Sequence, residues 1–249
     1  HKIPKVVIGC VDTFSDVNGK GIMKMEKAGI KVSIGVLEKE SRELNKRFFN
    51  FHEKKRPYII LKWAESNDGF IAPKDQAAPF WMTSSDSKKL VHQFRAEEDA
   101  ILVGRITAEK DNPCLTVREV TGKNPIRIVI DKDLKLSNKL NLFNNKAKTI
   151  IFNTIKTKKI NSNYYIKINF NNLIKNILHE LYKQKIQSLI IEGGAKTLQS
   201  FIDEKIWEEA RVFTANTTLV EGVKSPNIKG EIIFESIIDE DQLEIIKNE

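Results

Sequence analysis

The chain of 249 residues is long enough for one large domain, or for one domain and part of another. Its hydrophobic share of 41% is typical of a globular protein, and no apolar run approaches the roughly 20 residues of a membrane-spanning helix. The net charge of +8 would suit nucleic acid, but the lysines are spread along the whole chain and no recognised DNA-binding motif occurs. We therefore expect neither a membrane nor a nucleic-acid partner.

The two cysteines, Cys10 and Cys114, lie far apart and form no disulfide framework, which favours a cytoplasmic protein. Cys10 lies in an apolar run and is expected to be a buried, inert thiol. The four histidines show no metal-ligand spacing, so each is expected at the surface or in packing. The chain starts at His1 with no Met and no signal peptide, and we interpret this start as a cut in a longer gene product.

Residues 1–56 alternate strand and helix patterns. Strands are predicted over 5–11 and 31–37, and helices over 19–28 and 38–51. Two short strands and two helices make less than a typical domain. This segment therefore needs a partner to bury its apolar faces.

A domain boundary is predicted at Arg56-Pro57, because proline cannot continue a helix and the residue before it favours extended backbone. Strands are then predicted over 58–64, 100–103, 126–130, 149–152, 188–192, 209–215 and 243–246. Helices are predicted over 83–96, 171–184 and 194–204, and the stretch 137–163 is expected to be loops around one strand. This alternation over 57–249 predicts an α/β domain with a largely parallel sheet.

The predicted strand at 188–192 runs directly into Gly193 and Gly194 and then into a helix. Glycines at such a junction let the backbone approach a ligand closely, and the start of a helix offers unpaired N–H groups to a phosphate. A plain tight turn explains the same residues equally well. The pattern is not the G-x-G-x-x-G fingerprint of a standard dinucleotide site.

A second polar group follows the predicted strand at 100–103. Residues 105–111 should form a loop or short helix at the edge where open α/β sheets bind ligands. Arg95 and Arg118 flank this edge and suit a phosphate, because a guanidinium can donate two parallel hydrogen bonds to it. Each arginine could also be a plain surface cation, and Asp111 could be a turn former.

Lys62 lies inside an apolar strand, where an ammonium is costly unless it meets an anion or a polar cavity. The sequence Asn67-Asp68-Gly69 is a strong turn signal. Downstream, Trp81 could stack on a cofactor ring or belong to the core.

Together these motifs resemble the bifunctional deaminase–reductase of riboflavin biosynthesis over nearly the whole chain. The pieces similar to its reductase domain are Lys62-Trp63-Ala64, Asp68-Gly69, Trp81-Met82-Thr83, Arg95-Ala96, Asp111-Asn112-Pro113, Leu115-Thr116-Val117-Arg118, 125–129 and Glu192-Gly193-Gly194. The pieces similar to the tail of its deaminase domain are 6–12, 19–21, 35–37 and 44–49. The resemblance implies a remnant of a cytidine deaminase-like α/β segment over 1–56 and a dihydrofolate reductase-like reductase domain over 57–249.

The resemblance also implies a homodimer that uses NADPH to reduce 5-amino-6-(5-phosphoribosylamino)uracil to 5-amino-6-(5-phosphoribitylamino)uracil. The ribosylamine ring would open to an imine whose carbon accepts hydride. Lys62 or Asp111 would assist at the imine nitrogen, with Lys62 favoured.

The residues that the resemblance assigns to NADPH are Ala64, Trp81, Thr107, Asp111, Gly194, Ala195, Lys196, Thr197, Leu198, Gln199 and Ser200. Those assigned to the phosphorylated pyrimidine substrate are Arg95, Leu115, Arg118 and Glu192. Thr83, Ser84 and Ser85 are further candidates for binding the 2′-phosphate of the cofactor.

Two features depart from this family. A serine often precedes its tryptophan, where this chain has Pro79 and Phe80. The H-x-E and P-C-x-x-C zinc motifs of the deaminase are absent from this chain, so neither zinc nor deamination is expected from it, although a longer natural chain could have both. Two alternative functions stay open: a reductase of a pterin or another pyrimidine, and a non-catalytic basic binding module.

Overall fold

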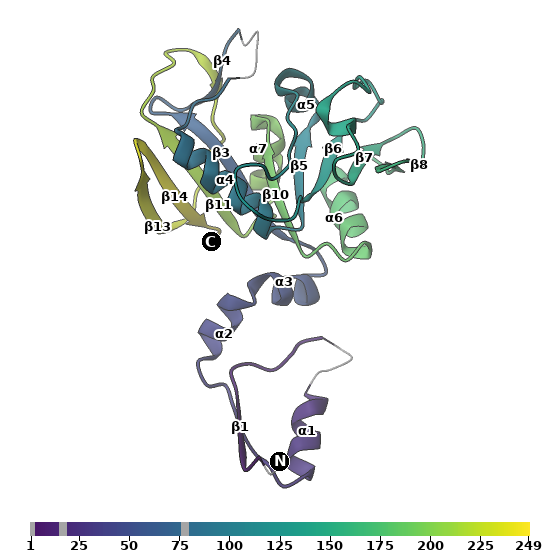
Figure 1. Ribbon diagram of the computed structural model, residues 1–249, viewed down its shortest axis with the longest axis vertical. Helices are drawn as coiled ribbons and strands as arrows, with labels where there is room; N and C mark the ends of the chain where they lie inside the picture. The colour runs from purple at the N-terminus through teal and green to yellow at the C-terminus, as the bar shows by residue number, and fades with distance from the viewer. Residues whose placement is uncertain (1–2, 15–18, 76–79) are drawn as a thin grey trace.

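The computed structural model describes residues 3–14, 19–75 and 80–249. A small N-terminal unit lies below the main body in Figure 1. Its strands β1 (Lys5–Ile8) and β2 (Lys31–Ile34) pair in parallel, and helix α1 (Lys20–Lys27) connects them. All three elements lie within the described ranges, and none of their residues is buried. The unit therefore leaves its apolar side chains uncovered, as its short elements led us to expect.

Two helices join this unit to the main body, α2 (Glu38–Leu44) and α3 (Lys46–Lys54). The prediction of one helix over 38–51 was wrong, because the chain leaves helical geometry at Asn45 (φ −108°, ψ 24°). The amide of Asn45 donates to the carbonyl of Ser41 over 2.9 Å, and such side-chain bonds compete with the helical backbone pattern. Helix α3 packs onto the main body, where Phe51 is buried against the ring of Tyr182 at 4.7 Å.

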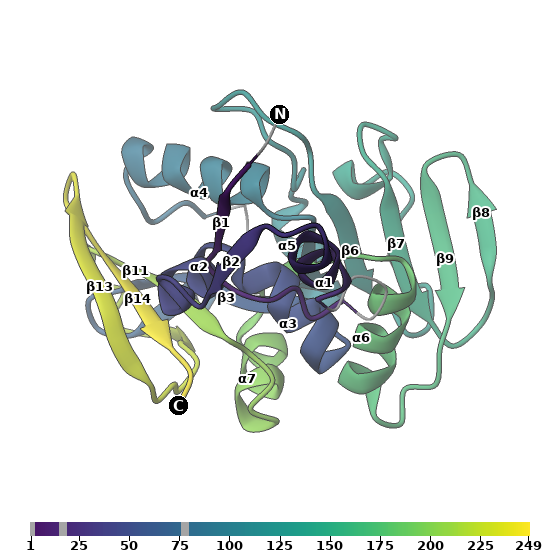
Figure 2. The same cartoon turned by 90° about the horizontal axis from the view of Figure 1, so that it is seen from below.

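The main body is built on a ten-stranded sheet in the order β13-β14-β11-β3-β10-β5-β6-β7-β9-β8. The strands are β3 (Tyr58–Ser66), β5 (Ala100–Gly104), β6 (Ile126–Ile130), β7 (Thr149–Asn153), β8 (Lys158–Ile160), β9 (Asn163–Lys167), β10 (Ser188–Gly193), β11 (Glu209–Ala215), β13 (Glu231–Ile238) and β14 (Asp241–Lys247). From β11 to β9 all neighbours run parallel, and only the outer pairs are antiparallel. Figure 2 shows β13 and β8 at the opposite edges. The prediction of an α/β fold with a largely parallel sheet is confirmed.

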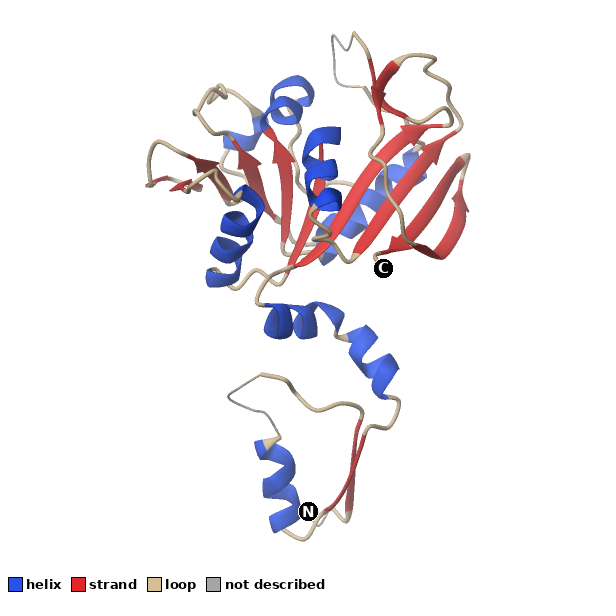
Figure 3. Ribbon diagram, turned by 180° about the vertical axis from the view of Figure 1, so that it is seen from behind, coloured by secondary structure: helices blue, strands red, loops and turns tan. Residues whose placement is uncertain are grey.

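Helices cover both faces of this sheet. Helices α4 (Ser85–Glu97) and α5 (Arg105–Asp111) lie on the face seen in Figure 1, and α6 (Leu173–Lys183) and α7 (Ala195–Asp203) lie on the face seen in Figure 3. Alternate residues of one strand point to opposite faces, so Leu61 belongs to the core under α6 and α7 while Ile60 belongs to the core on the other face. The central strands of the sheet are therefore buried on both sides.

Smaller elements complete the fold. The strands β4 (Phe70–Pro73) and β12 (Gly222–Lys224) form a separate two-stranded sheet, and η1 (Asn141–Phe143) is a single 3₁₀ turn. The expectation of one strand within 137–163 was wrong, because the stretch holds both β7 and β8. Within the described ranges, no helix is long and apolar enough to cross a membrane. Cys10 was expected to be buried but is only half-buried.

Candidate functional site

The carboxyl ends of β5 and β10 meet at one edge of the sheet, where Val103 is paired with Gly193. Strand β5 leads directly into α5, and β10 leads through Gly194 into α7. Two helices therefore begin side by side at the edge where parallel sheets bind their ligands.

The diglycine bend at this edge needs its glycines. Gly194 has φ +79°, and a Cβ built on it would lie 3.1 Å from Oγ1 of Thr107. A Cβ on Gly104 would lie 2.7 Å from Oγ1 of Thr197. The bend is thus lined by one threonine from α5 and one from α7. It brings together Thr107, Gly194 and Thr197, which the resemblance assigns to NADPH.

The other residues of the predicted cofactor segment differ in availability. Leu198 is only 1% exposed and belongs to the core. The hydroxyl of Ser200 donates to the carbonyl of Lys196 over 2.8 Å, and the amide of Gln199 donates to Asp203 over 2.8 Å. Thr197, in contrast, has its hydroxyl oxygen at the bend, 3.9 Å from a Cβ built on Gly194.

Arg95 and Glu192, both predicted to bind substrate, pair with each other. Nε of Arg95 lies 2.9 Å from Oε1 of Glu192, and Nη2 lies 2.5 Å from Oε2, so the pair is bidentate. Both side chains are less than a tenth exposed. Burial raises the pKa of Glu192, but the charges of Arg95 and Lys62 outweigh this effect and hold its pKa below the usual value. Glu192 is therefore an ionised carboxylate that Arg95 holds by both oxygens.

Lys62 lies beside this pair on β3. Because Leu61 is paired with Ile191, the next residue on each strand places Lys62 next to Glu192. Burial lowers the pKa of the Lys62 ammonium, and the charge of Glu192 opposes that shift. Of the two environments expected for a lysine in this strand, an anion or a polar cavity, the structure provides the anion.

The segment 112–118 joins the site with an unusual backbone. Asn112 has φ +41° and Leu115 has φ +48°, the left-handed region that non-glycine residues seldom adopt. The side chain of Leu115 is 2% exposed and belongs to the core, so only its backbone can face a ligand. Arg118 is exposed, and its Nη1 donates to Oγ1 of Thr116 over 3.0 Å. Between Arg95 and Arg118, it is Arg118 whose guanidinium is accessible to a phosphate.

His92 is a residue of this region that sequence reasoning did not select. It is fully buried on α4, and its Nδ1 accepts a hydrogen bond from the backbone N–H of Arg118 over 3.1 Å. Burial, with the charges of Arg95 and Arg118, lowers the pKa of His92 to about 4. Its place three residues before Arg95, on the same face of a helix, was the signal that could have indicated its role.

The start of α4 leaves little room for a cofactor phosphate at Thr83, Ser84 or Ser85. The backbone N–H of Ser84 and the hydroxyl of Ser87 both donate to the buried carboxylate of Asp241, over 2.8 and 2.6 Å. A carboxylate already occupies the positive end of this helix, and it would repel a phosphate. The prediction for these three residues therefore loses its physical basis.

The remaining predicted residues have different surroundings. Trp81 is 53% exposed, which excludes a core role, and the ammonium of Lys88 lies 5.4 Å from the centre of its ring. Ala64 is half-buried and packs against the core cluster under α4, and Asp111 ends α5. Pro79 lies outside the described residues. Among the residues that the structure describes, no three His, Cys, Asp or Glu side chains are grouped to hold a metal ion.

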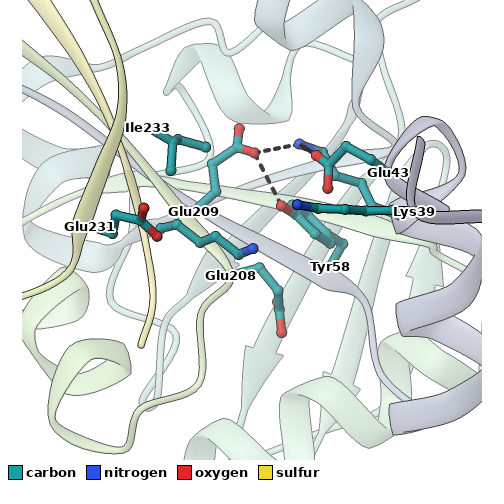
Figure 4. Close-up of a pocket in the computed structure, with 9 residues that line it drawn as sticks. Lys39, Glu43, Tyr58, Glu208, Glu209, Glu231 and Ile233 are labelled. Carbon is teal, nitrogen blue, oxygen red and sulfur yellow. Dashed lines mark hydrogen bonds and ion pairs between the residues drawn. The ribbon is translucent and has the colours of Figure 1, made fainter.

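A separate cavity of about 250 Å³ lies between α2–α3 and the strands β11, β13 and β14 (Figure 4). Glu209 points into it and accepts hydrogen bonds from Lys46 at 3.0 Å and from the Tyr58 hydroxyl at 3.1 Å. Its lining includes none of the residues predicted for cofactor or substrate. This cavity therefore belongs to the junction of α3 with the sheet.

A family profile described as the RibD C-terminal domain matches residues 57–230. The chain belongs to this family. It is 38% identical to the riboflavin biosynthesis protein RibD of Aquifex aeolicus, over 94% of this chain and 67% of that protein. It is also 31% identical to the 2,5-diamino-6-ribosylamino-4(3H)-pyrimidinone 5′-phosphate reductase of the same organism, over 70% of this chain and 83% of that protein.

A similar solved structure is that of the diaminohydroxyphosphoribosylaminopyrimidine deaminase/5-amino-6-(5-phosphoribosylamino)uracil reductase of Thermotoga maritima. That crystal structure superposes with a TM-score of 0.87 at 30% identity, covering 99% of this chain and 72% of its own. The chain spans about two thirds of the length of the RibD proteins that it matches. The match to the family profile begins at residue 57 and does not include residues 1–56. Their origin as a deaminase remnant therefore stays a prediction.

Proposed function

We propose that this chain is an NADPH-dependent reductase of riboflavin biosynthesis that reduces 5-amino-6-(5-phosphoribosylamino)uracil to its ribitylamino counterpart. The observation that carries the proposal is the meeting of two features at one sheet edge. These are the diglycine bend between α5 and α7 and the buried charged group of Arg95, Glu192 and Lys62. The similarity to proteins named as reductases of this substrate class supports it.

The bend suits the phosphates of NADPH. Gly194 has no side chain to block a close approach, the first N–H groups of α7 point out of the helix, and Thr107 and Thr197 add hydroxyls. The bound cofactor would supply hydride to the substrate carbon. We assign Ala64, Trp81, Asp111 and Lys196 to the border of the same site, on their resemblance to the family motif.

The substrate would be held mainly by Arg118 and Glu192. The exposed guanidinium of Arg118 suits the substrate phosphate, because it can donate two parallel hydrogen bonds. Glu192 is ionised, and its carboxylate can accept hydrogen bonds from N–H groups of the pyrimidine. Arg95 acts through Glu192, since its fork holds both carboxylate oxygens.

Lys62 is the residue that we assign to the proton. Its ammonium lies next to Glu192 and away from bulk water, and burial lowers its pKa, which makes it a stronger acid than an exposed lysine. It would hold and transfer the proton at the nitrogen of the opened ribosylamine.

The test is to incubate the purified chain with 5-amino-6-(5-phosphoribosylamino)uracil and NADPH. We expect NADPH oxidation with formation of the ribitylamino product, and much slower turnover with NADH. A pterin substrate that is reduced faster than the phosphoribosylamino-uracil would contradict the assignment. Absence of NADPH binding, measured by quenching of tryptophan fluorescence, would remove the reductase proposal altogether.

A further inference from the structure

His92 has an incompletely used imidazole in the middle of the proposed substrate residues. Its side chain is 0% exposed, and its Nδ1 accepts the N–H of Arg118. The proton of the neutral ring must then lie on Nε2, which has no hydrogen-bond partner among the residues that the structure describes. A buried polar atom without a partner costs free energy, so packing alone does not account for a histidine here.

The residues from Leu115 to Gly122, here called the Arg118 loop, lie along α4. Glu119 forms an ion pair with Lys88 at 3.1 Å. A Cβ built on Gly122 would lie 2.5 Å from Cβ of Ala96, so the backbone of the loop touches the helix there. Lys88, His92 and Ala96 follow at intervals of four residues, which places them in one stripe of the helix.

His92 is the central contact of this stripe, and of these three helix residues only His92 is buried. It holds the backbone of Arg118 itself, whereas the contacts of Lys88 and Ala96 reach its neighbours. The position of the Arg118 backbone fixes where the exposed guanidinium can reach. The ring is neutral at neutral pH, because burial and the charges of Arg95 and Arg118 lower the pKa of His92 to about 4, and Nδ1 can therefore act as an acceptor.

We propose that His92 is a positioning residue of the substrate site, which holds the backbone of Arg118 through Nδ1 and thereby directs its guanidinium to the substrate phosphate. The inference rests on the proposed function for the role of Arg118, but the contact itself does not depend on it. His92 need not touch the substrate.

Three variants separate the acceptor at Nδ1 from the rest of the ring. In His92→Asn the side-chain oxygen is bonded to Cγ, as Nδ1 is, so it can accept the N–H of Arg118. In His92→Gln the oxygen lies one carbon further out, and His92→Leu has no acceptor. We expect the Leu and Gln variants to raise KM for the phosphoribosylamino-uracil roughly ten-fold, the worth of one hydrogen bond. The same variants should change kcat and KM for NADPH less than about two-fold, and the Asn variant should restore KM.

A second measurement does not depend on turnover. Hydrogen exchange at the Arg118 amide, followed by NMR, should be slow in the wild type and in His92→Asn, and fast in the Leu and Gln variants. Equal KM values in all four proteins, or rescue by Gln and not by Asn, would overturn the inference. If the wild type does not reduce the phosphoribosylamino-uracil, the proposed function is wrong. The contact between His92 and Arg118 is tested separately: it is refuted if the Arg118 amide exchanges as slowly in His92→Leu as in the wild type. Circular dichroism identifies a misfolded Leu variant, in which case the Asn and Gln pair decides.

Discussion

Lys62, Glu192 and Arg95 form a buried group with two positive charges and one negative charge. Arg95 donates hydrogen bonds to both oxygens of the single carboxylate, Glu192. The negative charge next to Lys62 is therefore already paired with another cation. Burial of an ammonium that is only partly compensated favours its neutral form. Lys62 is therefore the group in this set that is most ready to release a proton.

We predict that Lys62→Met lowers kcat by about 100-fold or more, the usual effect of losing a general acid. In the wild type, kcat should fall as pH rises through the pKa of Lys62, which burial places below its usual value of 10.5. Stopped-flow measurement of NADPH oxidation at several pH values checks both. Lys135→Met is a matched control, because Lys135 is 66% exposed. Unchanged turnover in Lys62→Met would remove this residue from the mechanism.

The two arginines of the site should behave differently when they are removed. Arg118→Ala should raise KM for the substrate. The loss of binding free energy should be about 1.5–3 kcal/mol, because the variant lacks an accessible charge-assisted hydrogen bond. Arg95→Ala should instead lower the free energy of unfolding by about 3–5 kcal/mol, because it leaves the buried carboxylate of Glu192 unpaired. Steady-state kinetics and urea unfolding of both variants test the contrast. A stable Arg95→Ala protein with a raised KM alone would return Arg95 to direct phosphate binding.

At the scale of elements, α3 and the short segment after it, which includes Arg56, are attached to the main sheet by partly buried ion pairs. Arg47 holds both oxygens of Glu98, which is fully buried, and Arg211 also reaches Glu98. Arg56 holds Glu208 with contacts of 2.9 and 2.6 Å. Pairs of this kind are costly to break one side at a time. By its contacts α3 is part of the main body, although the predicted boundary assigned it to residues 1–56.

We predict that a chain starting at Lys46 is more stable than one starting at Pro57 by about 3 kcal/mol or more, since the burial of a Phe51-sized side chain alone is worth this much. The second chain would also leave Glu98 without its partner Arg47. Urea unfolding of both shortened chains gives the difference. Equal free energies of unfolding would support a domain that begins at Pro57.

The sequence patterns located the central strands well and the edges poorly. The run Ile126–Ile130 was predicted to the residue, because four of its five residues are apolar, as is typical of a strand buried on both faces. Strand β8 was missed because Lys158 and Lys159 are exposed, and lysine is a common residue on edge strands. A strand with no buried face does not need alternating apolar residues, so its sequence shows no strand pattern.

The candidate site shows the same limit. The diglycine bend was predicted because glycine readily adopts the positive φ of Gly194, so the residue type itself indicates the turn. The pairing of Arg95 with Glu192 was not predicted, because the two residues are 97 positions apart and meet only through the order of the strands. His92 was missed for the same reason, since its partner Arg118 lies 26 residues away in a segment without secondary structure.

At the scale of the whole molecule, the edge strand β13 is unusually apolar. Ile232, Phe234 and Ile237 are 49%, 50% and 69% exposed. An exposed apolar edge is a template for pairing with another chain. We therefore expect the homodimer to form through β13. Sedimentation velocity should give a dimer, and Ile237→Lys should shift it toward monomer. Ile155→Lys should not, at a residue that is 55% exposed in the connection from β7 to the opposite edge strand β8. A monomeric wild type would contradict this expectation.

The last hairpin, β13 and β14, follows the stretch that the family profile matches, yet β14 lies inside the sheet against β11. Asp241, the first residue of β14, accepts hydrogen bonds from Ser84 and Ser87 at the start of α4. A gene trimmed to the limits of the profile would encode a product with an open β11 and an untethered helix, the same helix that carries His92 and Arg95. Such a product would precipitate during expression, and a stop codon before this hairpin would abolish the enzyme as completely as the loss of its active site.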